Sequence, residues 1–427
     1  MTLKRNIPPK VWGVDRVEYI EPSQHHLKNG AELFVMNSGD QEVVKIDFSF
    51  KAGSWYGKSR LNSTMAASLL QEGTSHHKAT EIANLFDFYG AQFSSASSYD
   101  NNYISFLSLK KYLPQLLPMV SENIRESTFP TEEFEILRQK KKQRAIVDAD
   151  RVGLIAQKNF LRNLFGEGHP YAPVASPESY DYIKLEDVKS HFKNYYLPER
   201  MTITASGSVD SEVIQLIEEK FSASWGVSNL AADSINNHQL PVPEKSIYIE
   251  KTGANQNALA IGKLFPTQNH PDFPGIKLLC TILGGYFGSR LMSNIREDKG
   301  YTYSINASPI SFLHYGVFLV FTEVKTDKTE ATVNEVFKEI AKLSEELIKE
   351  EELIPIQNYM LGRILEDFDG PFSRAHTFAS LRESNLDFGY YNRLINTIKT
   401  ATPVEIRELA QKYLTTESMS TIIAGTR

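Results

Sequence analysis

Two side chains in the second half of the chain have the types and spacing to stabilise a developing negative charge. Arg296 and Tyr303 lie in the stretch GGYFGSRLMSNIREDKGYTYS, residues 284–304. Gly300 between them allows the backbone to reverse, and the alternating residues after it predict a strand. Such a corner brings a guanidinium and a phenol together as two fixed hydrogen-bond donors, which polarising a carbonyl group requires. The same pair could instead serve only to tie the corner together.

The elements that must position this corner follow from hydrophobic periodicity and from glycine and proline punctuation. In the second half we expect strands over 246–251, 258–262, 317–324 and 419–424, and helices over 273–283, 330–348, 354–368, 371–383 and 404–413. In the first half we expect a hairpin over 31–51, strands over 92–98, 103–109 and 201–206, and helices over 62–70, 80–89, 113–126, 132–148, 154–164, 185–195 and 212–221.

The two halves end alike at a constant offset of 218 residues. Tyr195 matches Tyr413, Met201 matches Met419, and Gly207 matches Gly425. Both segments read as a helix, a short polar turn, an apolar strand and a glycine, so a duplicated domain is the best interpretation.

The polar stretch between the two halves has no periodicity and predicts a linker. We therefore expect an N-terminal domain over 1–226, a linker over 227–244 and a C-terminal domain over 245–427. The predicted fold class is α+β. Each domain is a mainly antiparallel sheet with helices packed on one face, and the two together form a clamshell half with an inner cavity.

Composition indicates a globular protein and points to no charged macromolecule as a partner. The 427 residues are 41% apolar and 23% charged, with a net charge of -6. This is typical of a globular protein and gives no reason to expect nucleic acid as a partner. The small negative charge would favour basic peptides only weakly. The single cysteine, Cys280, excludes an internal disulfide and lies in an apolar run that predicts a buried thiol.

No run approaches the roughly 18 apolar residues of a membrane span. The start, MTLKRNIPPKVWG, lacks the apolar region of a secretory signal. The sequence as given therefore predicts a cytoplasmic protein, or a periplasmic one if a leader has been removed.

Three blocks resemble the insulinase/pitrilysin family of zinc metallopeptidases, in its short form built like mitochondrial processing peptidase. They are GSWYGKSRLNSTMAASLLQEGT at 53–74, YGAQFSSASSYDNNYISF at 89–106, and HPDFPGIKLLCTILGGYFGSRLMSNIREDKGYTYSI at 270–305. The resemblance runs from about residue 20 to the end. It implies a mechanism based on the helical motif H-x-x-E-H, whose histidines ligate zinc and whose glutamate is the general base. A glutamate about 75 residues later would be the third ligand.

The sequence departs from this pattern at every zinc position. Aligned on the family, Thr64 and Ser68 stand where the histidines would be, Ala67 where the base would be, and Arg144 near the downstream ligand. None of these is a plausible zinc ligand or base. No two histidines are three to five residues apart, and His25-His26, His76-His77 and His169 lie in contexts that predict loops. The sequence predicts no metal, no cofactor and no peptidase activity for this chain alone.

The family's R-x(6)-Y motif, by contrast, is matched by Arg296 and Tyr303. In the family this pair faces the zinc and hydrogen-bonds the substrate, which adds itself to a sheet edge as a strand. The chain resembles the non-catalytic subunit of bacterial heterodimeric peptidases, whose partner carries the H-x-x-E-H motif and the zinc. It lacks the long glycine-rich loop of the mitochondrial α-type subunits. The alternative is a catalytically inactive peptide-binding or structural protein of the same fold.

Overall fold

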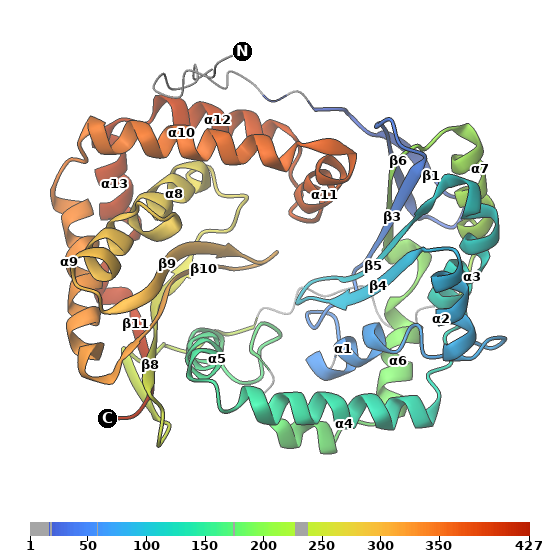
Figure 1. The fold of residues 1–427 in the computed structure, drawn as a ribbon, viewed down its shortest axis with the longest axis horizontal. Coiled ribbons are helices and arrows are strands. Elements are labelled where there is room, and N and C mark those ends of the chain that lie inside the picture. Colours follow the sequence, from blue (N-terminus) through green and yellow to red (C-terminus); the bar gives the residue numbers. More distant parts are fainter. Residues whose placement is uncertain (1–16, 18, 58, 174–175, 227–237) are drawn as a thin grey trace, which may run out of the picture.

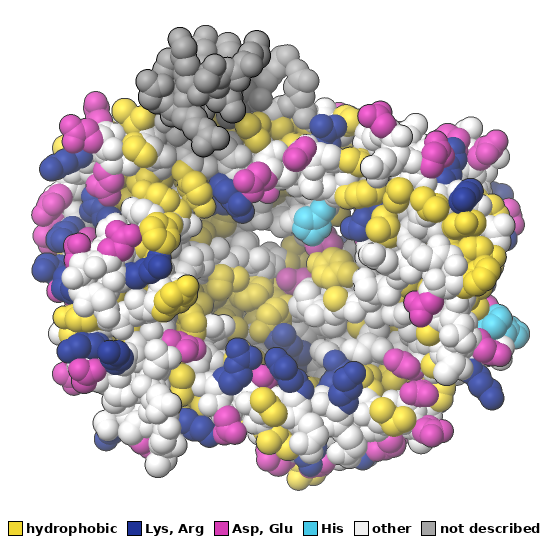
Figure 2. Space-filling view, viewed as in Figure 1, with side chains coloured by type: hydrophobic (Ala, Val, Ile, Leu, Met, Phe, Trp, Pro, Cys, Tyr) yellow, Lys and Arg dark blue, Asp and Glu magenta, His cyan; other side chains and the backbone are white. Residues whose placement is uncertain are grey.

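The chain folds into two similar halves that face each other across a central hollow (Figures 1 and 2). The computed structural model describes residues 17, 19–57, 59–173, 176–226 and 238–427. Each half contains one β-sheet with helices outside it, as the sequence predicts. The fold is therefore an α+β clamshell.

The first sheet has the strand order β1-β2-β6-β3-β5-β4 within the described residues. Its strands are β1 (Ser23–His26), β2 (Glu32–Asn37), β3 (Val43–Phe50), β4 (Gln92–Ser97), β5 (Asn102–Leu109) and β6 (Met201–Gly207). β6 is parallel to β2 and every other pair is antiparallel.

The second sheet has the order β7-β11-β8-β10-β9, which repeats the order β2-β6-β3-β5-β4 of the first sheet; β1 has no counterpart there among the described residues. Its strands are β7 (Ser246–Glu250), β8 (Gln256–Phe265), β9 (Thr302–Ser311), β10 (Gly316–Lys325) and β11 (Ser420–Gly425). Again the C-terminal strand of the half, β11, lies parallel to the first strand and antiparallel to the next. The shared topology confirms the duplication that the 218-residue offset indicates, and it makes the edge strands β4 and β9 equivalent.

Helices cover the outer faces of both sheets (Figure 1). The helices of the first half are α1 (Arg60–Ser68), α2 (Ala79–Phe88), α3 (Leu113–Glu126), α4 (Thr131–Asp148), α5 (Val152–Phe165), α6 (Leu185–Tyr195) and α7 (Ser211–Phe221). Those of the second half are α8 (Phe273–Cys280), α9 (Thr329–Glu345), α10 (Glu350–Asp367), α11 (Gly370–Glu383), α12 (Gly389–Thr400) and α13 (Pro403–Tyr413).

One helix from each half packs against the sheet of the other half. α5 packs on β8 and β11 of the second sheet, and α11 packs on β2 and β6 of the first. The strands accordingly bury side chains on both faces. In β2, Leu33 and Val35 belong to the core of the first half, whereas Phe34 contacts Phe378 of α11 with ring centres 5.0 Å apart. In the second sheet, Phe160 of α5 belongs to an apolar cluster with residues of β8, β10 and β11.

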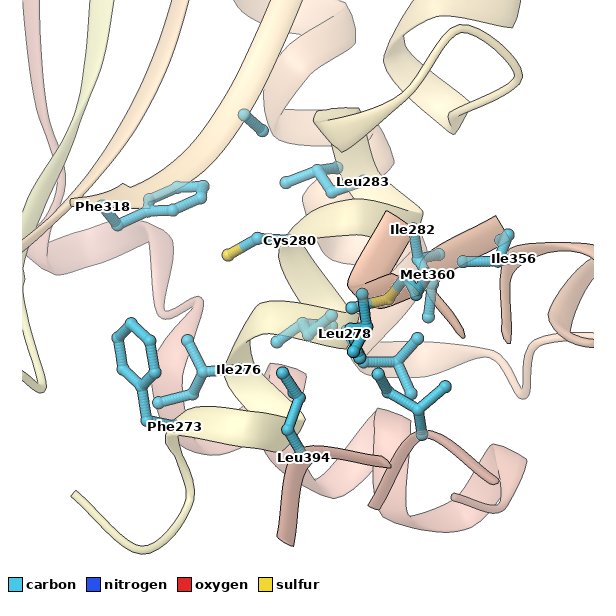
Figure 3. Packing of buried hydrophobic residues seen from close by; sticks show 14 of the residues in the cluster. Phe273, Ile276, Leu278, Cys280, Ile282, Leu283, Phe318, Ile356, Met360 and Leu394 are labelled. Atoms are coloured by element: carbon cyan, nitrogen blue, oxygen red, sulfur yellow. The ribbon is translucent and has the colours of Figure 1, made fainter. Parts of the chain in front are cut away.

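The core of the second half surrounds α8 (Figure 3). Phe273, Ile276, Cys280 and Phe318 are all buried there. Burial raises the pKa of the Cys280 thiol. The predicted burial of this cysteine is confirmed.

Two local predictions are wrong. β2 and β3 do not form the predicted hairpin over 31–51, because β6 lies between them and pairs with both. Sequence proximity favours a hairpin, but a strand about 150 residues later in the chain takes the central place. His25 and His26 lie in strand β1 rather than in a loop, where they pair with β2. α12 was not expected from the sequence.

Most of the predicted linker, 227–237, lies outside the described residues, and the domain boundaries remain predictions. None of the described helices is both long and apolar enough to cross a membrane.

Candidate functional site

The corner that carries Arg296 and Tyr303 forms as the sequence predicts. A π-helical segment (Met292–Asp298) ends just before Gly300, which has a φ of +64°, and β9 begins at Thr302. A positive φ carries little steric penalty for glycine alone, so Gly300 allows the backbone to reverse at this point. The predicted turn residue is confirmed.

Hydrogen bonds and an ion pair join the helical side of the corner to α9. The side-chain amide of Asn294 donates to Glu335 Oε2 at 2.9 Å and to Glu339 Oε1 at 2.7 Å. Lys299 Nζ lies 3.2 Å from Glu335 Oε2. The hydrogen bond from Asn294, together with Lys299, holds the pKa of Glu335 below its usual value. This network fixes the position of the segment that carries Arg296.

The glycine-rich turn before the corner is fixed in the same way. A Cβ on Gly284 would lie 2.6 Å from the Cβ of Ala307 in β9, so only glycine allows this close approach. Arg290 forms a two-pronged ion pair with Glu352 of α10, with Nε–Oε1 at 2.7 Å and Nη2–Oε2 at 3.0 Å. Both contacts position the turn against the core.

Tyr303 is turned out of the sheet by a β-bulge. The register between β9 and β10 shifts so that Tyr303 and Ser304 both lie opposite Glu323. A bulge breaks the simple alternation of side chains and re-aims them. Tyr303 is 86% exposed although the next inward residue, Ile305, is buried. The alternation predicted for this strand therefore starts only after the bulge.

The guanidinium of Arg296 lies near two exposed aromatic rings. Its Cζ is 4.6 Å from the ring centre of Phe287 and 5.4 Å from that of Tyr303. No described carboxylate lies within ion-pair distance of Arg296 and no described group hydrogen-bonds its side chain. The N–H donors of Arg296 and the hydroxyl of Tyr303 are thus available to a ligand.

Phe287 is a site residue that sequence reasoning missed. It is 62% exposed, which is unusual for a large apolar side chain. Its only signal in the sequence is an aromatic residue inside a glycine-rich turn, and that pattern does not reveal which way the ring points.

The degenerate zinc-motif positions lie on α1 and α4, which are neighbouring helices. The hydroxyl of Ser68 donates to the backbone oxygen of Thr64 at 2.9 Å, and Ala67 is buried. The Nε of Arg144 lies 3.2 Å from Asp148 Oδ2. A cation and two hydroxyl side chains, one of them bonded to its own helix, do not fit a zinc ion. No hydrogen bond or ion pair joins these positions to Arg296 or Tyr303 in the described parts of the chain.

The histidines have other surroundings. His77 Nδ1 lies 2.9 Å from Glu122 Oε1, and His76 Nε2 lies 3.5 Å from Glu126 Oε2, so this pair faces the acidic side chains of α3. His169 is in a loop but is buried, and burial lowers its pKa to about 4. Within the described residues, no group of three or more His, Cys, Asp or Glu side chains is arranged to hold a metal ion.

Comparison with known proteins gives a consistent result. Residues 34–178 match the family model described as insulinase (peptidase family M16), and residues 182–360 match the model described as peptidase M16 inactive domain. The uncharacterized zinc protease YmxG of Bacillus subtilis is 21% identical over 82% of this chain and 85% of its own length. An uncharacterized zinc protease of Rickettsia felis is 25% identical over 79% of this chain and 82% of its own.

Solved structures share the fold over nearly the whole chain. A peptidase M16 inactive domain from Pseudomonas fluorescens has a TM-score of 0.85 at 22% identity, covering 96% of this chain and 99% of its own. A protease from Helicobacter pylori has a TM-score of 0.85 at 20% identity, with coverages of 95% and 99%. A chain of complex III2 from Candida albicans has a TM-score of 0.75 at 14% identity, with coverages of 94% and 95%.

Proposed function

Because this chain belongs to the insulinase family, peptidase family M16, we propose that it acts as the non-catalytic subunit of a heterodimeric zinc metallopeptidase. In this role it closes one side of the reaction chamber. It supplies Arg296 and Tyr303 as hydrogen-bond donors to a peptide bound at the zinc site of a homologous partner subunit.

The observation that carries this proposal is the pair of unengaged donors at the corner. Arg296 has no acidic partner among the described residues, and Tyr303 is turned towards solvent by a bulge. If the Arg–Tyr pair were purely structural, its side chains would be expected to hydrogen-bond within the corner. Here Asn294 and Lys299, and not the pair, attach the corner to α9. Two fixed donors can stabilise the oxygen of a carbonyl group as negative charge develops on it.

The residues at the zinc-motif positions support the need for a partner. Thr64, Ala67, Ser68 and Arg144 offer neither a ligand set nor a general base. If the donors serve catalysis, the zinc must therefore be held by another chain. We expect that chain to carry H-x-x-E-H in the same fold.

The sheet edges support peptide binding. β4 and β9 are the inner edge strands of their sheets, and neither has a second strand neighbour among the described residues. An unpaired edge can accept an extended peptide as an additional strand through main-chain hydrogen bonds.

The test is reconstitution with a partner that carries the H-x-x-E-H motif. Peptide cleavage by the pair is measured with wild type, Arg296→Ala and Tyr303→Phe, with Arg363→Ala as a matched control on the surface of α10. Loss of one such donor typically lowers the rate about 10²–10³-fold. If both variants cleave as wild type does, the donor role is wrong and the peptide-binding or structural alternative gains support.

A further inference from the structure

An open pocket of about 280 Å³ lies between α4, α5 and the short 3-10 helix Pro177–Asp181. Its charged lining is unusual, because it contains four cationic side chains and one acidic one: Lys141, Arg144, Lys158, Arg162 and Asp148. Figure 2 shows Lys and Arg side chains gathered below the central hollow, where Figure 1 places α5 and the adjoining end of α4. The chain is acidic overall, so this is a local reversal of charge.

Most of this positive charge is not neutralised within the protein. Asp148 is engaged by Arg144 at 3.2 Å and lies 3.6 Å from Arg151 Nη1. In the described parts of the chain, no carboxylate forms an ion pair with Lys141, Lys158 or Arg162. The Nη2 group of Arg162 is also buried without a hydrogen-bond partner. A buried donor without an acceptor is costly, so an incoming acceptor would be bound favourably.

A second pocket adjoins the first and is lined by two arginines and one carboxylate, that of Glu167. Arg162 also lines a neighbouring cavity of about 270 Å³, together with Arg60 and hydroxyl side chains such as Ser59 and Ser179. Arg60 Nη1 is a second buried donor without a partner. The Arg60 guanidinium lies over the ring of Tyr99, with Cζ 3.9 Å from its centre, which limits its freedom to turn away. Two unpartnered guanidinium donors therefore lie at adjoining pockets.

The lysine on α5 is affected by this environment. Burial lowers the pKa of Lys158, Asp148 raises it, and the nearby charges of Arg162 and Arg60 lower it further. Burial likewise lowers the pKa of Lys141, with Lys140 adding to the effect. A bound anion would counteract the repulsion between these cations.

We propose that this pocket binds a carboxylate carried by an acidic side chain of a peptide. Guanidinium and ammonium groups together provide charge-assisted hydrogen bonds to an oxyanion. The pocket is at the lower end of the size range for ligand sites, which suits one or two residues of an extended chain. Arg144, which stands near the family's downstream zinc-ligand position, thus becomes part of an anion site. The inference rests on the proposed function only in taking a peptide as the source of the anion.

The test uses the purified chain alone, without a partner or zinc. The probes are two rhodamine-labelled octapeptides of glycine and serine, blocked at both ends, carrying either three glutamates or three glutamines. Binding is followed by fluorescence anisotropy at 50 and 300 mM NaCl. We expect the glutamate peptide to bind at least about tenfold more tightly than the glutamine peptide, because charge-assisted hydrogen bonds are stronger than neutral ones. Its binding should weaken at 300 mM NaCl, because salt screens the charges.

The variant Lys158→Gln/Arg162→Gln is expected to weaken binding of the glutamate peptide about tenfold or more. Lys189→Gln/Lys193→Gln removes the same charge from exposed positions on α6 and is expected to change affinity less than about twofold. Circular dichroism checks that both variants fold. If the first does not, Lys141→Gln replaces it, with an expected loss of about threefold.

Three outcomes would overturn the proposal. The two peptides could bind equally, or the control variant could lose as much affinity as the pocket variant. Alternatively, the glutamate peptide could fail to bind while inorganic phosphate, followed by equilibrium dialysis, binds to wild type and not to Lys158→Gln/Arg162→Gln, which would make phosphate the ligand. None of these results bears on the cleavage test of Arg296 and Tyr303, so the two proposals fail separately.

Discussion

The guanidinium of Arg296 stacks on the ring of Phe287, with Cζ 4.6 Å from the ring centre, although Phe287 is nine residues earlier in the chain. Phe287 and Tyr303 are exposed and Arg296 is half-buried, and the Cζ of Arg296 also lies 5.4 Å from the ring centre of Tyr303. A cation held over an aromatic face is restricted in orientation while its N–H groups remain free for a ligand. We therefore propose that Phe287 positions the guanidinium of Arg296.

Replacing Phe287 with alanine should weaken the function of Arg296 without unfolding the corner. An exposed cation–π contact contributes about 0.5–1 kcal/mol, so we expect kcat/KM of the reconstituted peptidase to fall about two- to fivefold. The thermal unfolding temperature should be unchanged, because the ring is largely exposed. Phe287→Tyr should retain activity. Phe88→Ala, on the exposed surface of α2, is the matched control, and equal activity of Phe287→Ala and wild type would contradict the prediction.

Replacing Asn294 with alanine should lower the stability of the second half. The amide donates to both Glu335 and Glu339, and Glu339 is buried. Removing a donor from such acceptors should lower the free energy of unfolding by about 1–3 kcal/mol. The measurement is equilibrium unfolding in urea. Asn396→Ala on the exposed face of α12 is the control. Equal destabilisation by the two variants would show that the network around Asn294 is not what fastens the corner.

Because α5 packs on the second sheet and α11 packs on the first, we expect that neither half folds alone. Residues 1–226 would leave the apolar face of α5 exposed and would uncover Phe34 and Met36 of β2, which α11 normally buries. Apolar patches of this kind promote aggregation. We expect each half expressed alone to be insoluble, and the two halves expressed together to assemble into a soluble complex. A soluble, cooperatively unfolding N-terminal half would contradict this.

The sequence was sufficient for features that depend on local patterns. The corner at Gly300, the helix α6 and the duplication of the domain could be predicted, because periodicity, glycine and repeat spacing are local signals. The membership of the family also follows from motifs that stand in order along the chain.

What the sequence did not predict depends on contacts between distant segments. The placement of β6 between β2 and β3 requires a pairing over about 150 residues. The bulge at Tyr303 depends on the register with β10, and the stack on Phe287 depends on how the glycine-rich turn folds back. The basic pocket combines side chains of α4, α5 and the 3-10 helix Pro177–Asp181, so no single stretch of the sequence indicates it.

Acidification should destabilise the protein in part through His191. This ring is buried in α6, with Nε2 2.8 Å from the backbone oxygen of Ala52, and burial lowers its pKa to about 4. In the unfolded chain the pKa is about 6.5, so unfolding takes up a proton between these two values. The stability contributed by the neutral ring is complete above pH 6.5 and is lost as the pH falls towards 4. The full loss is up to about 3 kcal/mol.

The measurement compares variants, because other buried groups titrate in the same range. Burial raises the pKa of Asp100 and Glu383, which are protonated more readily in the folded state and so act in the opposite direction. His191→Gln keeps an amide donor for Ala52 but cannot titrate. Its unfolding free energy should fall less steeply than that of wild type between pH 6.5 and 4.5, whereas His26→Gln, at an exposed position in β1, should follow wild type. If His191→Gln and wild type lose stability in parallel, the ring is not a buried neutral histidine whose protonation is coupled to unfolding.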